Sequence, residues 1–221
     1  MRVLMVDDDP FTRATLASSL QVLGCFVIAA ESVSTALRTM RNFAFENAPN
    51  VALLDLDLGE GPTGLDLAQT LREEFPSLAI VMLSTYQDPR LIGTNLPALP
   101  LDAIYLVKGS ISSPKVLGDA LIQALENITN KKSANLTKGE ESIALNGLTD
   151  KQIEMMRLVA AGHSNTEIAR RLWITEAAVE KSITRLSKNL ALTGSKEQNL
   201  RVLIARAYHQ YSGSVNVRTE S

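Results

Sequence analysis

Residues 2–9 read RVLMVDDD, an apolar run that ends abruptly in three carboxylates. Two more apolar runs have the same form: VALL at 51–54 is followed by Asp55, and IYLV at 104–107 is followed by Lys108. Short apolar runs of this kind are typical of buried parallel strands. Ligands bind at the carboxyl edge of an open α/β sheet, so the pattern predicts a charged site at that edge.

The charges indicate which ligands this edge takes. Carboxylates brought close together repel one another, so Asp7, Asp8 and Asp55 favour a hard cation such as Mg²⁺. The ammonium group of Lys108, facing the same carboxylates, indicates that an anion also binds there. The simplest such anion is a phosphoryl group.

These residues resemble the receiver domain of bacterial response regulators, and the resemblance covers residues 1 to about 127. In that family an acidic pair after the first strand binds Mg²⁺, and an aspartate after the third strand accepts a phosphoryl group. The resemblance implies that Asp7 and Asp8 are the acidic pair and that Asp55 is the acceptor and a further metal ligand. Asp57 stands where the family uses a backbone carbonyl as another ligand.

The same resemblance assigns the remaining positions of the site. Ser84 follows the fourth apolar run and matches the hydroxyl residue that contacts the phosphoryl group. Lys108 matches the family's lysine, which with Mg²⁺ stabilises the charge of the group being transferred. Tyr105, three residues earlier, matches the switch aromatic, so we expect Ser84 and Tyr105 to rearrange when Asp55 is phosphorylated.

The first half of the chain alternates strand-like and helix-like segments. This alternation predicts a doubly wound, five-stranded parallel sheet with helices on both faces, a flavodoxin-like α/β fold. We expect strands near residues 2–6, 25–30, 51–54, 79–83 and 103–107, and helices near residues 10–23, 32–44, 64–74 and 112–127. Three prolines and one glycine in the segment 88–100 predict a short or distorted helix there.

Charge divides the chain into two halves. The net charge of the whole protein is only −2, but residues 1–130 carry 8 Lys/Arg against 15 Asp/Glu and residues 148–211 carry 10 against 6. An acidic half joined to a basic half indicates two domains with different partners. We expect a receiver domain at 1–127, a linker at 128–147, a small all-α domain at 148–211 and a disordered tail at 212–221.

The basic half predicts amphipathic helices with clear amino-terminal caps. Thr149 is expected to cap the first, Ser164 or Asn165 the second, and Thr175 the third. Two short helices joined by a tight turn form a helix-turn-helix, whose second helix enters the major groove of DNA. The residues resemble the LuxR/NarL-type helix-turn-helix, and the matching positions are Leu148, Thr149, Gly162, Asn165, Ile168, Ala169, Leu172, Thr175, Glu176 and Val179.

Polar side chains on these helices are the candidates for contact with double-stranded DNA. Those on the recognition helix, near 175–190, are Lys181, Ser182, Thr184, Arg185 and Lys188. Those on the helix before it are Arg170 and Arg171. The last helix, near 196–211, is expected to close the domain core and to pair two subunits in a homodimer.

Together these features predict a cytoplasmic response regulator, not an enzyme, that is phosphorylated on Asp55 by a cognate sensor histidine kinase and regulates promoters. The single cysteine, Cys25, makes no internal disulfide, and no apolar run approaches the roughly 20 residues that span a membrane. One alternative is a regulator that works without phosphorylation and keeps the acidic pocket for another purpose. The other alternative is a haloacid-dehalogenase-like phosphatase, because Asp55-Leu56-Asp57 resembles the motif that carries the nucleophile and the general acid of those enzymes.

Overall fold

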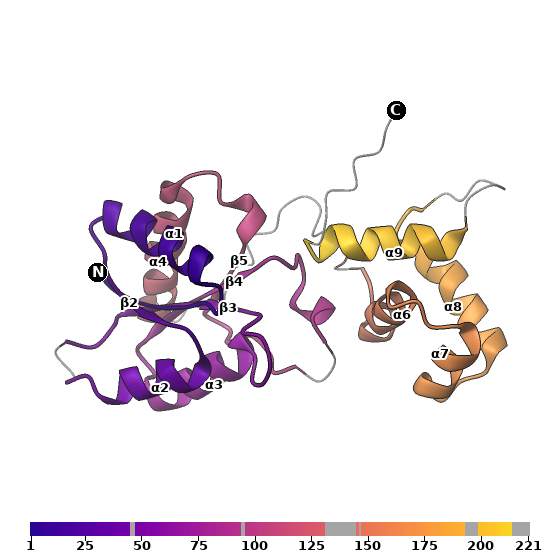
Figure 1. Cartoon of the computed structure of the whole chain (residues 1–221), viewed down its shortest axis with the longest axis horizontal. Helices are drawn as coiled ribbons and strands as arrows, with labels where there is room; N and C mark the ends of the chain where they lie inside the picture. Colours follow the sequence, from indigo (N-terminus) through magenta and orange to yellow (C-terminus); the bar gives the residue numbers. More distant parts are fainter. Residues whose placement is uncertain (45–46, 94–95, 131–144, 146, 193–198, 214–221) are drawn as a thin grey trace. The chain divides into compact units, whose positions relative to one another are not determined.

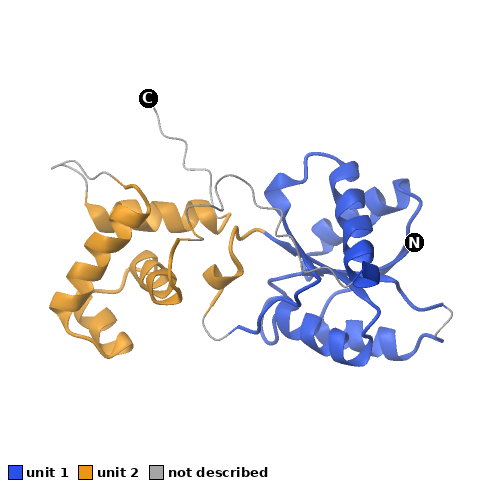
Figure 2. Cartoon of the chain, turned by 180° about the vertical axis from the view of Figure 1, so that it is seen from behind, with its two compact units in different colours: residues 1–84, 95–137 blue, residues 85–94, 138–221 orange. Residues whose placement is uncertain are grey.

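The computed structural model describes residues 1–44, 47–93, 96–130, 145, 147–192 and 199–213. The chain forms two compact units, which Figure 2 shows in different colours. Unit 1 contains residues 1–84 and 95–137, and unit 2 contains residues 85–94 and 138–221. The segment 85–94 therefore belongs with the carboxyl-terminal unit, although it lies between two strands of the amino-terminal one.

Unit 1 is built on a five-stranded parallel sheet with the strand order β2-β1-β3-β4-β5. The strands are β1 (Arg2–Val6), β2 (Phe26–Ala30), β3 (Val51–Asp55), β4 (Ala79–Ser84) and β5 (Ile104–Val107). Every residue of β3 and β4 is buried, as expected for central strands covered on both faces. The parallel sheet predicted from the apolar runs is confirmed.

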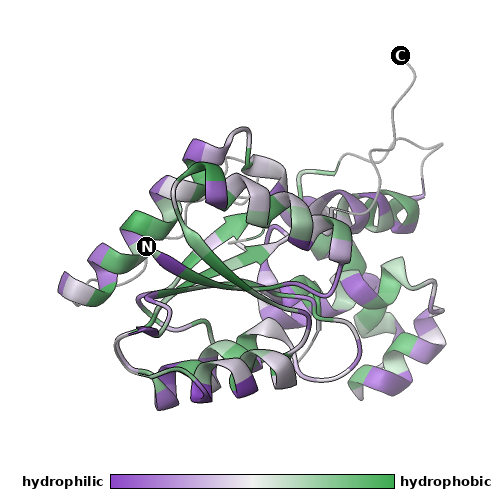
Figure 3. Ribbon diagram, turned by 60° about the vertical axis from the view of Figure 1, so that its left-hand side comes forward, coloured by the Kyte–Doolittle hydropathy of each residue, from purple (hydrophilic) through white to green (hydrophobic). Residues whose placement is uncertain are grey.

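Helices cover both faces of this sheet, with α1 and α4 on one side and α2 and α3 on the other (Figure 1). They are α1 (Pro10–Val22), α2 (Val33–Arg41), α3 (Gly64–Glu74) and α4 (Pro114–Asn130). The first begins where it does because the side chain of Asp9 accepts a hydrogen bond from Thr12 and Pro10 suits the first helical position. In Figure 3 the hydrophobic colour concentrates on the strands of the sheet, where the core lies.

Between β4 and β5 the described residues contain one helical turn, the 3₁₀ helix η2 (Pro89–Leu91). The expectation of a short or distorted helix over 88–100 is confirmed. Proline lacks the backbone N–H that the interior of a longer helix requires, and two further prolines, Pro97 and Pro100, follow η2 before β5 begins.

In unit 2 the helices are α6 (Asp150–Ala160), α7 (Asn165–Leu172), α8 (Glu176–Asn189) and α9 (Leu200–Tyr211). The side chains of Thr149, Ser164 and Thr175 cap the first three, so Ser164 rather than Asn165 caps the second. Gln152 completes a capping box with Thr149. The predicted helix-turn-helix is therefore present, with α8 as its second helix.

The predicted linker and tail lie largely outside the described residues, which omit 131–144, 146 and 214–221. Helix α4 continues to Asn130, three residues into the segment 128–147 that the sequence marked as a linker. Within the described parts of the chain, no helix is both long enough and apolar enough to cross a membrane.

Candidate functional site

Three carboxylates meet where β1 and β3 end. Asp7, Asp8 and Asp55 each offer an oxygen atom, and these atoms lie within 4.8 Å of one another. Asp7 and Asp55 are both buried, whereas Asp8 is exposed. The parallel strands place these acids together because their carboxyl ends share one edge of the sheet.

Lys108 lies against the same carboxylates. It opens the short 3₁₀ helix η3 (Lys108–Ser110) directly after β5, and its Nζ atom donates to Asp7 Oδ2 at 2.9 Å and to Asp55 Oδ2 at 2.8 Å. Burial alone would lower the pKa of this ammonium group, but the bonds and charges of Asp55 and Asp7 outweigh it and raise the pKa. Lys108 is therefore held charged between two acids.

The balance of charge at Asp55 remains unfavourable to its ionised form. Burial raises the pKa of Asp55 to about 6, although the hydrogen bond and charge of Lys108 lower it, and the charge of Asp7 raises it further. One ammonium group thus faces three carboxylates. A divalent cation bound by oxygen ligands fits this deficit of positive charge.

The backbone around the acids is shaped to approach them closely. A Cβ atom at Gly64 would stand 2.0 Å from the Asp55 carbonyl oxygen, so only glycine fits there. On the other side, Arg13 donates through Nη1 to the carbonyl oxygens of Asp7 at 2.7 Å and Asp8 at 3.1 Å. These contacts fix the loop that carries the acidic pair.

The other residues predicted for the site lie on the same elements. Ser84 is the last residue of β4 and is buried, next to Leu83, whose register partner on β3 is Asp55. Tyr105 lies within β5 and is only 3% exposed, so its ring is packed inside. The Asp57 side chain is exposed and accepts the Gly59 N–H at 3.3 Å, and it does not join the group of three carboxylates.

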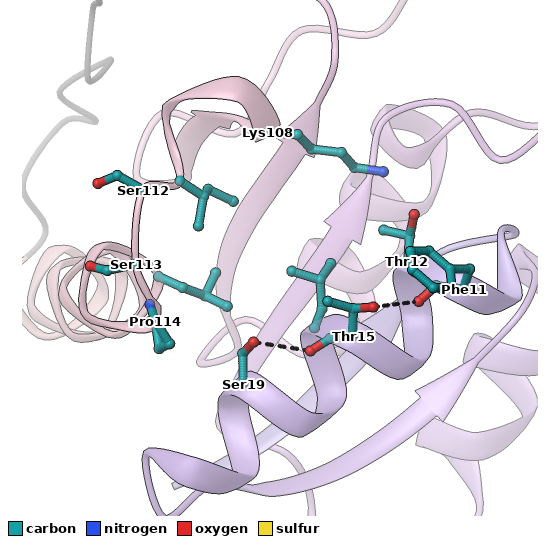
Figure 4. A pocket seen from close by; sticks show the side chains of 11 residues that line it. Phe11, Thr12, Thr15, Ser19, Lys108, Ser112, Ser113 and Pro114 are labelled. Atoms are coloured by element: carbon teal, nitrogen blue, oxygen red, sulfur yellow. Dashed lines mark hydrogen bonds between the residues drawn. The ribbon is translucent and has the colours of Figure 1, made fainter.

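A groove of about 460 Å³ opens beside Lys108, between α1 and the segment that leads into α4 (Figure 4). The apolar side chains along it are Phe11, Leu16, Ile111, Pro114 and Leu117, and hydroxyl groups come from Thr12, Thr15, Ser19, Ser112 and Ser113. Phe11 is 79% exposed, so most of its ring is accessible from the groove side. The groove therefore offers an apolar surface that ends at the charged site.

Helix α8 presents a second candidate surface. Its apolar stripe, Val179, Ile183 and Leu186, is buried in unit 2. The predicted DNA-contacting residues that are exposed are Lys181, Thr184, Arg185 and Lys188. Ser182 is partly buried and donates to the Ala178 carbonyl oxygen. Four of the five α8 candidates thus project away from the core.

The two arginines before this helix are already paired. Arg170 bonds Glu167 through Nε at 3.1 Å and Nη2 at 2.9 Å, and Arg171 bonds the same carboxylate at 2.7 Å. These bonds lower the pKa of Glu167 to about 2. Both arginines remain exposed, so they can exchange this shared carboxylate for a phosphate.

The sequence did not direct attention to Trp173, the chain's one tryptophan. It lies in the turn between α7 and α8, is 93% exposed and has a φ of 55°. A left-handed backbone favours glycine or asparagine, so a tryptophan there is an unusual choice. Its position two residues before the N-cap of α8 makes it a candidate for contact with DNA.

Two families of known proteins match the two parts of this chain. The family described as response regulator receiver domain matches residues 3–104, and the one described as bacterial regulatory proteins, luxR family, matches residues 146–199. Similar proteins include the nitrate/nitrite response regulator protein homolog of Haemophilus influenzae, 29% identical over 198 residues. That alignment covers 86% of this chain and 90% of that protein. The transcriptional regulatory protein LiaR of Bacillus subtilis is 28% identical with the same coverage.

Solved structures resemble the chain as a whole. An RcsB response regulator in complex with DNA has a TM-score of 0.54 and 20% identity, covering 95% of this chain and 98% of that one. A structure of two RcsB dimers bound to two parallel DNAs has a TM-score of 0.57 and 20% identity, covering 98% and 99%. At this level of identity the likeness establishes the fold.

Proposed function

The chain belongs to the response regulators that join a receiver domain to a LuxR-family DNA-binding domain, and we propose that phosphorylation of its Asp55 controls its binding to promoter DNA. The observation that carries the proposal is the placement of Asp55 and Lys108 at one edge of the sheet, 2.8 Å apart. A nucleophilic carboxylate with a cation beside it suits the transfer of an anionic group, because the cation can stabilise the negative charge of that group.

In the proposed reaction a carboxylate oxygen of Asp55 attacks the phosphorus atom of a phosphorylated donor. A bond forms between that oxygen and phosphorus, while the bond from phosphorus to the donor breaks and its electron pair stays with the donor. The product is an acyl phosphate on Asp55. Lys108 stabilises the negative charge on the phosphoryl oxygens, and the hydroxyl group of Ser84 then donates to one of them.

We further propose that Asp7, Asp8 and Asp55 hold Mg²⁺, with the Asp57 carbonyl oxygen as another ligand. The three convergent carboxylates and the raised pKa of Asp55 fit a hard cation. When bound, the ion would supply positive charge that neutralises the acids and the incoming phosphoryl group.

Millimolar Mg²⁺ is expected to raise the melting temperature, because the ion binds the folded state selectively. At ten times its dissociation constant the gain is about 1.4 kcal/mol, which corresponds to several degrees. Asp8→Ala should remove the response, and a full response in that variant would refute the metal assignment. A proton on Asp55 competes with the ion, so the response should shrink as pH falls through about 6.

The donor is proposed to be a sensor histidine kinase that docks in the groove between Phe11 and Lys108. An exposed phenylalanine beside the site is suited to bury against a protein and is not needed by a small molecule. Phe11→Ala is therefore expected to slow transfer from a phosphorylated kinase at least tenfold, a loss of about 1.4 kcal/mol. Uptake from acetyl phosphate should be unchanged, and equal slowing with both donors would place Phe11 in the chemical site instead.

DNA binding is proposed to use α8, with two copies of the chain on one promoter. The exposed cations on α8 support a DNA-binding surface there. The exposed Val202 on α9 supports a surface for a second copy of the chain. RcsB has been seen as dimers on DNA. Since promoter DNA is the proposed partner, the cytoplasm is the proposed location.

A further inference from the structure

The residues that follow β4 are built into the DNA-binding unit. We call residues 85–93 the strap. They lie directly after Ser84 in the sequence, yet they group with unit 2, as Figure 2 shows. Leu91 is fully buried in the apolar core that α6, α7, α8 and α9 share, and Tyr86 packs against that core. The core of the DNA-binding unit is therefore completed by a segment that the receiver supplies.

Arg90 fastens the strap to the start of α6. Its own neighbour Asp88, which is buried, accepts from Nε and Nη2 and so orients the guanidinium group. The remaining N–H groups donate to the Leu148 carbonyl oxygen at 2.9 Å, the Leu145 carbonyl oxygen at 3.1 Å and Asp150 Oδ1 at 3.0 Å. A planar guanidinium group suits such simultaneous bonds, and lysine would not replace it.

The other side of the strap is fastened to the end of α9. The Gln87 N–H donates to the Tyr211 carbonyl oxygen at 2.8 Å, and the Tyr208 hydroxyl donates to the Leu91 carbonyl oxygen at 3.1 Å. Just past α9 the chain passes so close that a Cβ atom at Gly213 would lie 2.7 Å from the Thr85 carbonyl oxygen. The carboxyl-terminal end of α9 is thus covered by the strap.

The connection between the strap and the candidate acceptor site is covalent and short. Ser84 is the last residue of β4, and only Thr85, Tyr86 and Gln87 separate it from Asp88, which orients the guanidinium group of Arg90. Consecutive Cα atoms are fixed 3.8 Å apart, so three residues provide little slack. A displacement of Ser84 can therefore act on the strap through this short connection.

We propose that the strap is an internal ligand of the DNA-binding unit, docked in the unphosphorylated protein and released when Ser84 moves toward a phosphoryl group on Asp55. The docked strap holds the unit in a form that binds DNA weakly. It adds chain connections between the two units beyond the linker, and it covers the carboxyl-terminal end of α9, the helix that is proposed to face a second copy. This inference rests on the proposed phosphorylation of Asp55.

Two variants of the full-length chain undo the docking from opposite sides. Arg90→Ala removes the bonds to the start of α6, and Gly213→Ala places a methyl group against Thr85. Gly24→Ala is the matched control, because Gly24 lies in unit 1 and also has a positive φ, 76°, but nothing lies within 4 Å of its added Cβ atom. Arg41→Ala controls for the loss of an arginine that is ion-paired within unit 1.

The first measurement is hydrogen exchange over residues 85–93, with the phosphorylation state read by intact mass. In the untreated wild type these amides should be protected. Mg²⁺ with acetyl phosphate should remove the protection, and Arg90→Ala and Gly213→Ala should lack it without treatment. Unchanged protection in wild type that carries the phosphoryl group would overturn the proposal. A wild type that takes up no phosphoryl group would instead overturn the proposed function.

The second measurement is affinity for a duplex selected from a random pool by the treated wild type. Without acetyl phosphate, Arg90→Ala and Gly213→Ala should bind this duplex about 5–150-fold more tightly than wild type, the usual range of coupling between two sites. Treatment should add little in these variants, whereas the two controls should keep the wild-type response. Weaker binding in both strap variants, treated and untreated, would make the strap a part of the active fold and would also overturn the proposal.

Discussion

Replacing Asp55 by asparagine is expected to abolish the uptake of a phosphoryl group from acetyl phosphate. Asparagine has nearly the shape of aspartate but lacks the nucleophilic carboxylate, so no acyl phosphate can form. The fold should survive, because burial already disfavours the charge on Asp55 and raises its pKa to about 6. The melting temperature without Mg²⁺ is therefore expected to stay at or above that of the wild type.

Intact mass spectrometry measures this result directly, since wild type gains the mass of one phosphoryl group and Asp55→Asn gains none. Asp119→Asn is the control, because Asp119 is an exposed carboxylate on α4 and the change in charge is identical. A singly phosphorylated Asp55→Asn product would move the acceptor to another residue. Wild type that gains no mass but binds promoter DNA would favour a regulator that works without phosphorylation.

The second large effect is expected on α8, where Lys181→Ala should weaken binding to the cognate duplex by about 1–3 kcal/mol. Lys181 is exposed in the first turns of α8, the helix proposed to enter the major groove, while its neighbours Val179 and Ile183 face the core. If it reads a guanine edge, the loss is confined to the cognate sequence and preference relaxes at one base pair. If it contacts only phosphate, all sequences weaken alike and the salt slope falls by about one unit.

Competition binding on cognate and scrambled duplexes at two salt concentrations separates these outcomes, and we expect the base-contact pattern. Lys115→Ala, a change of the same charge on the exposed face of α4, controls for the net charge of the chain. Arg170→Ala should show the phosphate pattern with a smaller loss, because Glu167 already compensates part of its charge. Equal affinity of Lys181→Ala and wild type on both duplexes would remove Lys181 from the interface.

The sequence alone determined the receiver sheet and the residues at its edge. Apolar runs that end in charge predict buried parallel strands, and parallel strands place their ends together whatever the details of packing. That is why Asp7, Asp55 and Lys108, which are far apart in the chain, were correctly expected to lie together. The caps at Thr149 and Thr175 were equally readable, because capping depends on a few neighbouring residues.

Only the tertiary structure decided where the segment after β4 belongs. Its prolines predicted that no long helix forms there. A proline disfavours a helical conformation, but it does not indicate which part of the protein the segment packs against. Arg90 bonds carbonyl oxygens near residues 145–150, and Leu91 packs in a core formed by the other half of the chain. Backbone carbonyls carry no sequence signal, and an isolated Leu-Ile pair has no periodicity. The assignment of this segment to the carboxyl-terminal unit therefore follows from long-range packing, which no local sequence pattern encodes.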